Sequence, residues 1–85
     1  MAAKARETRF LKVYGLTLTQ RDALIDAQGG LCAICQKHEA VHVDHDHVTG
    51  QVRGVLCFRC NAALGQVADS SETLRRMIEY IERTS

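Results

Sequence analysis

Apolar and polar positions follow a helical period most clearly near the end of the chain. Large aliphatic side chains recur there at i, i+3, i+4 and i+7, forming a stripe of Leu74, Met77, Ile78 and Ile81. Charged residues fill the positions between them, and Asp69 or Ser70 offers an N-cap. The pattern predicts an amphipathic C-terminal helix within residues 69–84. Its stripe either packs on the core or contacts a second copy of the chain, which would make a homodimer.

Another helix is predicted earlier in the chain from the residues that begin and end it. Thr17 followed by Gln20 fits a capping box, and the pair Gly29-Gly30 ends the element. We expect a helix over about residues 18–28, within a helical lead-in that spans 15–30.

Between these helices the pattern changes from a helical period to that of strands. The segment VHVDHDH alternates apolar and polar residues in its first half, and QVRGVLC is rich in β-branched residues. Thr49-Gly50 lies between them as a candidate hairpin turn. The following FRCNAALGQV has a helical composition, and its helix is predicted to start near Cys60. The predicted order is therefore strand, turn, strand and helix.

Length and charge narrow the class of protein. The 85 residues make one domain, residues 1–85, of a size at which a hydrophobic core alone is marginal. Eleven Lys and Arg against ten Asp and Glu give a net charge of +1, which provides no support for nucleic-acid binding. No apolar run is long enough for a membrane span or a signal-peptide core, so we expect a cytoplasmic protein with no membrane partner.

The first 14 residues carry a local cluster of positive charge. This basic arm, residues 1–14, contains Lys4, Arg6, Arg9 and Lys12. It either faces phosphate groups or is a solvated N-terminal arm, and charge alone does not decide between the two.

Four cysteines give the strongest chemical signal. Cys32-Ala-Ile-Cys35 and Cys57-Phe-Arg-Cys60 are two CxxC pairs separated by 21 residues, the spacing of a four-cysteine zinc site. Each CxxC turn directs two sulfurs to one point, and two such turns complete a tetrahedron. A redox dithiol is the alternative, but it needs only one pair. The sequence predicts a structural Zn²⁺.

Four thiolates saturate a structural zinc, which leaves Asp44, His45, Asp46 and His47 without a role in that site. Carboxylate and amide oxygens suit Mg²⁺ or Mn²⁺, so this surplus predicts a second, different metal. Asn61 directly follows the last zinc ligand and is a candidate oxygen donor. Neighbouring residues of a straight strand face opposite ways, so Asp44 and His45 would need separate roles. A nonspecific histidine-rich metal chelate is the simpler alternative.

In their order along the chain, CAIC, HVDHDH and TGQVRGVLCFRCNAALG resemble the recombination endonuclease VII family of His-Me finger (HNH-like) nucleases. The match covers about residues 31–65, and YGLT through AQGG at 14–30 resembles the family's helical lead-in. The resemblance implies a small, zinc-stabilised α+β fold of the ββα-metal type. A zinc-bound hairpin and helix at 31–65 would be flanked by N- and C-terminal helices.

The resemblance also implies roles for individual residues. By position, Asp44 and Asn61 correspond to the ligands of the catalytic divalent ion, and His45 corresponds to the general base. His47 corresponds to an active-site histidine that orients the phosphate or assists the metal. Arg53 falls in the VRG element and either contacts a phosphate of the nucleic acid or is a strand-surface charge.

The implied reaction is metal-dependent hydrolysis of DNA phosphodiester bonds, leaving 5′-phosphate ends, in a bacterial or phage-infected cell. A non-catalytic zinc-knuckle module that binds nucleic acid or acts as an adaptor is the alternative. Only 20 residues follow Gly65, whereas junction resolvases of this family carry a substantial helical region there. We therefore expect a nicking or weakly specific nuclease, in which dimerisation through residues 70–83 would restore paired cuts.

Overall fold

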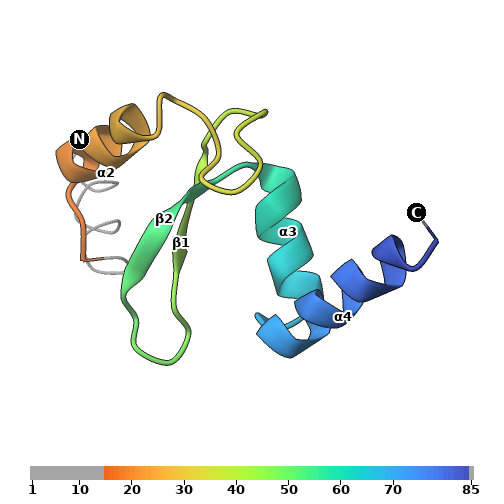
Figure 1. The fold of residues 1–85 in the computed structure, drawn as a ribbon. Coiled ribbons are helices and arrows are strands. Elements are labelled where there is room, and N and C mark those ends of the chain that lie inside the picture. The colour runs from red at the N-terminus through yellow and green to blue at the C-terminus, as the bar shows by residue number, and fades with distance from the viewer. Residues whose placement is uncertain (1–14, 85) are drawn as a thin grey trace.

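The structure is a computed structural model that describes residues 15–84, so the predicted basic arm at 1–14 lies outside the described residues. In chain order the described part contains a helix, a two-stranded hairpin and two further helices (Figure 1). These elements are α2 (Leu18–Ala27), β1 (His42–His45), β2 (Val52–Leu56), α3 (Phe58–Gln66) and α4 (Ser71–Glu82). The predicted small α+β architecture, with a hairpin followed directly by a helix, is confirmed.

Helix α2 begins at the predicted capping box. The Thr17 hydroxyl accepts the Gln20 backbone N–H at 3.1 Å, and the Gln20 side-chain oxygen accepts the Thr17 N–H at 2.9 Å. After the helix, Gly29 and Gly30 take positive φ angles of 68° and 80°, which reverse the chain at low steric cost. The predicted lead-in helix is therefore confirmed at both ends.

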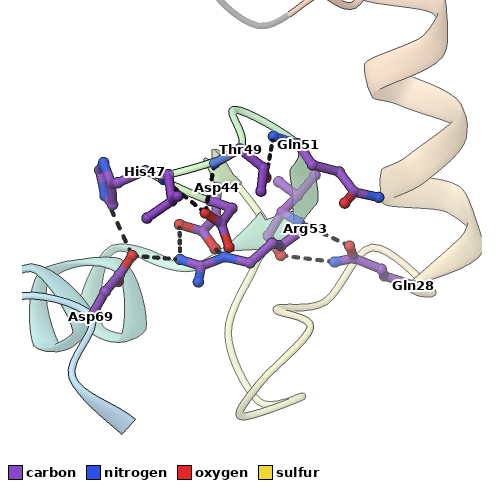
Figure 2. A network of polar contacts seen from close by, with 10 residues as sticks. Gln28, Asp44, His47, Thr49, Gln51, Arg53 and Asp69 are labelled. Carbon is purple, nitrogen blue, oxygen red and sulfur yellow. Dashed lines mark hydrogen bonds and ion pairs between the residues drawn. The ribbon is translucent and has the colours of Figure 1, made fainter.

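The side chain of Gln28, at the end of α2, forms hydrogen bonds with the backbone of β2. Its amide oxygen accepts the Val55 N–H at 2.9 Å, and its NH₂ group donates to the carbonyl oxygens of Val55 at 2.8 Å and Leu31 at 2.9 Å (Figure 2). The amide thereby binds the fully buried Val55 backbone much as a neighbouring strand would. This contact joins α2 to β2.

Replacing Gln28 by Ala is expected to destabilise the protein by about 1–3 kcal/mol, because it leaves the buried Val55 N–H without its acceptor. Thermal or urea unfolding of the zinc-loaded protein measures this change. Gln66→Ala, at the exposed end of α3, is the matched control and should have little effect. Equal stability of the two variants would contradict the role of the Gln28 amide.

The hairpin is antiparallel, and its register shifts once. His42 pairs with Leu56, Val43 with Val55, and Asp44 with Gly54, whereas His45 pairs with Val52. Arg53 is consequently the extra residue of a β-bulge, opposite the step from Asp44 to His45. The extra residue lies in β2, so the expectation that Asp44 and His45 of β1 face opposite ways stays a prediction.

The loop of the hairpin is organised by Asp46 and is longer than the predicted Thr49-Gly50 turn alone. The Asp46 carboxylate accepts the backbone N–H groups of Val48 at 2.8 Å and Thr49 at 3.0 Å. Its own N–H donates to the Gln51 carbonyl at 2.8 Å. Hydrogen bonds from the Thr49 and Val48 amides lower the pKa of the Asp46 carboxyl group. Asp46, which carried no predicted role, is therefore a turn-forming residue.

Helix α3 begins at Phe58 rather than near Cys60. The Cys57 sulfur is the N-cap and accepts the Cys60 backbone N–H at 3.4 Å, so the helix starts as soon as the strand ends. The prediction was wrong because Cys57 is not among the usual N-cap residues. As a result, Cys57 and Cys60 lie in one rigid turn.

The hydrophobic core is small and is built around the cysteines. Cys32, Leu56 and Cys57 are its buried members, and Cys35, Cys60 and Leu64 pack against it. Few purely apolar residues are fully buried among residues 15–84. The fold therefore relies on the cysteine cluster at the point where other domains of this size rely on aliphatic packing.

Helix α4 extends away from the hairpin at the far end of α3 (Figure 1). Its N-cap is Ser70, whose hydroxyl accepts the Thr73 N–H at 3.1 Å, which decides between the two predicted caps. Three residues of the predicted stripe are largely exposed: Met77 at 45%, Ile78 at 54% and Ile81 at 64%. The stripe therefore does not pack on the core formed by the described residues. None of the described helices has the length and apolar character needed to cross a bilayer.

Candidate functional site

The two CxxC pairs converge on one point, as the spacing predicted. Cys32 and Cys35 lie in the loop that follows α2, and Cys57 and Cys60 lie at the start of α3. All four sulfurs lie within 4.8 Å of one another, and the Sγ atoms of Cys35 and Cys57 are 3.8 Å apart. A tetrahedral zinc with Zn–S bonds of about 2.3 Å places its sulfurs roughly 3.8 Å apart. The cluster therefore fits Zn²⁺ in ligand type and in geometry.

Two thiols of the cluster have opposite pKa shifts. Burial raises the pKa of the Cys32 thiol, but backbone hydrogen bonds from the Cys57, Cys35 and Ile34 amides outweigh burial and lower the value to about 6. For Cys60, burial together with the neighbouring thiols raises the pKa to about 12. Without a metal, Cys32 therefore loses its proton more readily than Cys60.

The affinity for zinc is expected to fall as the pH is lowered. Zinc binds thiolates, so its binding must release the proton that the raised pKa keeps on Cys60. Each proton released weakens the apparent affinity about tenfold per pH unit. Competition with a chelator whose own pKa values are known, between about pH 6 and 8, measures how the apparent zinc affinity changes with pH. A zinc affinity that does not change over this range would contradict proton release.

A second, polar cluster lies beside the hairpin. Asp44 in the middle of β1 is buried, with 9% of its surface exposed, and its carboxylate accepts two hydrogen bonds from the guanidinium of Arg53. The distances are 2.7 Å from Nε to Oδ2 and 3.1 Å from Nη2 to Oδ1 (Figure 2). This planar, two-bond pairing is the geometry that arginine favours with carboxylates. The bulge at Arg53 accompanies this pairing across the two strands.

The cluster extends from Arg53 to the turn between α3 and α4. Nη2 of Arg53 also donates to Oδ2 of Asp69 at 3.0 Å, and Nε2 of His47 lies 3.5 Å from the same oxygen (Figure 2). Asp69 has a positive φ of 58°, in a turn where Ala68 is also left-handed at 52°. The contacts of Asp69 with Arg53 and His47 were not predicted from the sequence, where Asp69 was considered only as a helix cap.

His45 and His47 lie close together. Their ring centroids are 5.0 Å apart, with His45 half-buried on β1 and His47 exposed on the hairpin loop. The predicted general base and the predicted assisting histidine therefore face the same region. His42, at the other end of β1, instead lies 6.2 Å from the ring of Phe58.

Asn61 lies in the first turn of α3 and is half-buried. Its backbone N–H donates to the Cys57 carbonyl at 3.0 Å, so the turn that carries Cys57 and Cys60 fixes its backbone position. The joint ligation of an ion by Asn61 and Asp44 stays a prediction.

A groove of about 690 Å³ runs between the hairpin loop and the α3–α4 turn. Its lining includes His47, Arg53 and Asp69 together with the small residue Gly65. A smaller cavity of about 250 Å³ lies against Asp44 and Gly54, and Arg53 lines both spaces. The guanidinium therefore stands between the open groove and the Asp44 carboxylate.

Among the described residues, the four cysteines are the only group of three or more His, Cys, Asp or Glu side chains whose ligand atoms converge. A divalent ion at Asp44 would accordingly take its other ligands from the Asn61 amide, water and substrate oxygens, which are the donors that Mg²⁺ and Mn²⁺ prefer. The donor types fit such an ion. Both Asp44 oxygens are engaged by Arg53, so the ion and the guanidinium would compete for them.

These features define a small α+β module with a four-cysteine cluster that fits Zn²⁺, in which a hairpin and the helix after it carry carboxylate, guanidinium and imidazole groups. The chain belongs to the recombination endonuclease VII family, whose model matches residues 7–83. The chain is 46% identical over 82 residues to "Gene 59 protein" of Mycobacterium phage D29, a match that covers 91% of this chain and 50% of the relative. The protein of the same name from Mycobacterium phage L5 is 46% identical over 80 residues, covering 88% of this chain and 49% of the relative. The chain thus spans about half the length of these curated relatives.

Proposed function

We propose that the protein is a metal-dependent DNA endonuclease that hydrolyses phosphodiester bonds. The observation that carries the proposal is the pairing of His45 with His47, 5.0 Å apart, beside the Asp44–Arg53 ion pair on a hairpin that four cysteines hold in place. A purely structural zinc module has no need of this second cluster. Membership in the endonuclease VII family supports the same conclusion.

In the proposed mechanism His45 acts as general base and takes a proton from the attacking water. Histidine is the usual side chain for proton transfer near neutral pH. His47, on the loop beside it, orients the phosphate, and Arg53 provides a cationic contact for the same group. Asp44 and Asn61 would hold Mg²⁺ or Mn²⁺, which stabilises the charge that develops on the phosphate and on the leaving 3′ oxygen. The expected products carry 5′-phosphate ends.

The experiment that tests the proposal is incubation of zinc-loaded protein with supercoiled plasmid and Mg²⁺ or Mn²⁺. We expect nicked and then linear DNA from the wild type, and a much slower reaction from His45→Ala. The alternative is a non-catalytic zinc-knuckle module that binds nucleic acid or acts as an adaptor. If both proteins bind DNA and retain zinc but neither cleaves with any metal, that alternative replaces the nuclease.

The form of the DNA substrate needs a separate comparison. A panel of ordinary duplex, nicked duplex, single-stranded and four-way-junction DNA, cut under the same conditions, ranks the substrates directly. We propose that nicked or branched DNA is cut as well as ordinary duplex, with little sequence preference. The phage origin of the relatives supports a setting inside a bacterial or phage-infected cell.

We also propose that α4 joins two copies of the chain into a homodimer. Met77, Ile78 and Ile81 of its stripe are exposed, and Leu74 is half-buried. In an antiparallel pair centred between Met77 and Ile78, Leu74 of each copy meets Ile81 of the other. Arg75 and Glu82 lie along one flank of the stripe, so the same arrangement brings each Arg75 near the Glu82 of the second copy.

Ile78→Lys is expected to weaken this dimer more than about 100-fold, because each of the two copies loses roughly 1.5–3 kcal/mol of apolar burial. Light scattering or sedimentation over a range of concentrations measures the mass of the assembly. Glu79→Lys places the same side chain on the opposite face of α4 and is the control. A wild-type protein that stays monomeric at high concentration, or equal masses for both variants, would exclude dimerisation through the stripe.

A further inference from the structure

Arg53 is shared between two carboxylates that belong to different parts of the fold. It donates Nε and Nη2 to Asp44 on β1, and Nη2 also donates to Asp69 in the turn between α3 and α4. The side chains of Asp44 and Asp69 are 11% and 20% exposed, and that of Arg53 is 39% exposed. The hydrogen bonds to Asp44 raise the pKa of the Arg53 guanidinium, and the negative charges of Asp44 and Asp69 raise it further. Burial of Arg53 acts in the opposite direction. A permanently charged side chain therefore bridges two acidic groups.

The position of Arg53 has a consequence for any cation that binds Asp44. Both Asp44 oxygens accept hydrogen bonds from the guanidinium, so a second cation that binds Asp44 must either share the carboxylate with Arg53 or displace one of its hydrogen bonds. Two cations held by one carboxylate would repel each other strongly in a partly buried site. Arg53 therefore needs another anionic partner at that moment.

Asp69 meets this need without a large movement. Its Oδ2 already accepts from Nη2 at 3.0 Å, and it lines the groove that Arg53 also lines. If Arg53 keeps its bond to Asp69 and releases Asp44, its guanidinium stays at the groove, where it can contact a phosphate. The left-handed backbone at Ala68 and Asp69, with φ angles of 52° and 58°, holds the carboxylate in the turn beside the hairpin.

We propose that Asp69 is a positioning residue that retains Arg53 when a divalent ion binds Asp44, and so lets one site exchange an ion pair for a metal ion. The proposal rests on the nuclease function proposed above. It concerns how Asp44, Arg53 and Asp69 contact one another before and after an ion binds. Asp69 touches neither the ion nor the reacting phosphate, and acts through Arg53.

The test is a double-mutant cycle in the affinity for Mn²⁺, with the structural site filled by zinc. Mn²⁺ bound to wild type, Arg53→Gln, Asp69→Asn and the double variant is measured from the loss of the free-ion paramagnetic resonance signal. Arg53→Gln removes the competing cation and should tighten Mn²⁺ binding roughly tenfold. Asp69→Asn should weaken binding roughly tenfold in the wild-type background, but less than about threefold when Arg53 is Gln.

A purely electrostatic effect of Asp69 predicts a different result, because its charge would attract Mn²⁺ with or without Arg53. Equal weakening by Asp69→Asn in both backgrounds therefore overturns the proposal, as does an Arg53→Gln variant that binds Mn²⁺ no more tightly than wild type. Asp44→Asn separates these failures from failure of the proposed function. If it leaves Mn²⁺ binding unchanged, the ion does not bind at Asp44 and this proposal falls, whereas the nuclease function falls only if the wild type does not cleave DNA. Melting temperatures of the zinc-loaded variants check that the changes are not losses of fold.

Discussion

Removal of zinc is expected to unfold the protein. Binding to a four-cysteine site contributes on the order of 10 kcal/mol of apparent folding free energy, which is comparable to the whole stability of a typical small domain, about 5–15 kcal/mol. In this chain Cys32 and Cys57 are themselves buried core residues, so removal of the metal takes away bonds at the centre of the fold. A strong chelator should abolish the cooperative thermal transition seen by circular dichroism, and added Zn²⁺ should restore it.

Controls for this prediction come from the site and from the metal. Cys60→Ser should give the same loss of structure without a chelator, because the variant retains only three thiol ligands. Excess Mg²⁺ should not restore the chelated protein, because Mg²⁺ prefers oxygen ligands. A chelated protein that contains no zinc but keeps its cooperative transition would show that aliphatic packing alone holds the hairpin and α3 together.

Local signals in the sequence predicted the elements that depend on neighbouring residues. The capping box of Thr17 and Gln20 located the start of α2, because both of its hydrogen bonds join residues three positions apart. The two CxxC pairs predicted the cluster, because each pair fixes its two sulfurs locally and zinc chemistry supplies the rest. The period of the apolar stripe likewise located α4.

Contacts between distant residues were not predictable in the same way. The bulge at Arg53 depends on the register between the two strands, and alternation of residue types does not specify where a register shifts. The bond from Arg53 to Asp69 joins residues 16 positions apart through a turn with left-handed backbone. Asp69 also has a plausible local role as a helix cap, and Ser70 filled that role instead. The sequence therefore predicted the types of group in the site better than their pairing.

Substitution of His45 by Ala is expected to lower the rate of DNA cleavage by about 10²–10⁴-fold, the usual contribution of a positioned general base. The side chain is half-buried on β1 and its ring lies 5.0 Å from that of His47, which lines the groove, so truncation removes the proposed proton acceptor next to His47. The rate is measured as nicking of supercoiled plasmid at saturating Mn²⁺, with zinc content and melting temperature recorded for each protein. His42→Ala is the matched control, because it removes an exposed imidazole from the same strand.

The cleavage rates of three histidine variants show whether His45 acts as a general base or whether any polar side chain lost from this strand slows cleavage. His45→Ala should abolish most activity, His47→Ala should lose less because it only orients the phosphate, and His42→Ala should retain nearly full activity. Added imidazole should restore part of the rate to His45→Ala, since a small base can occupy the space left by the ring, and should not restore Asp44→Asn. If His42→Ala is as inactive as His45→Ala while both keep zinc and fold, proton transfer by His45 is not the cause, and the strand as a whole contributes to DNA binding instead.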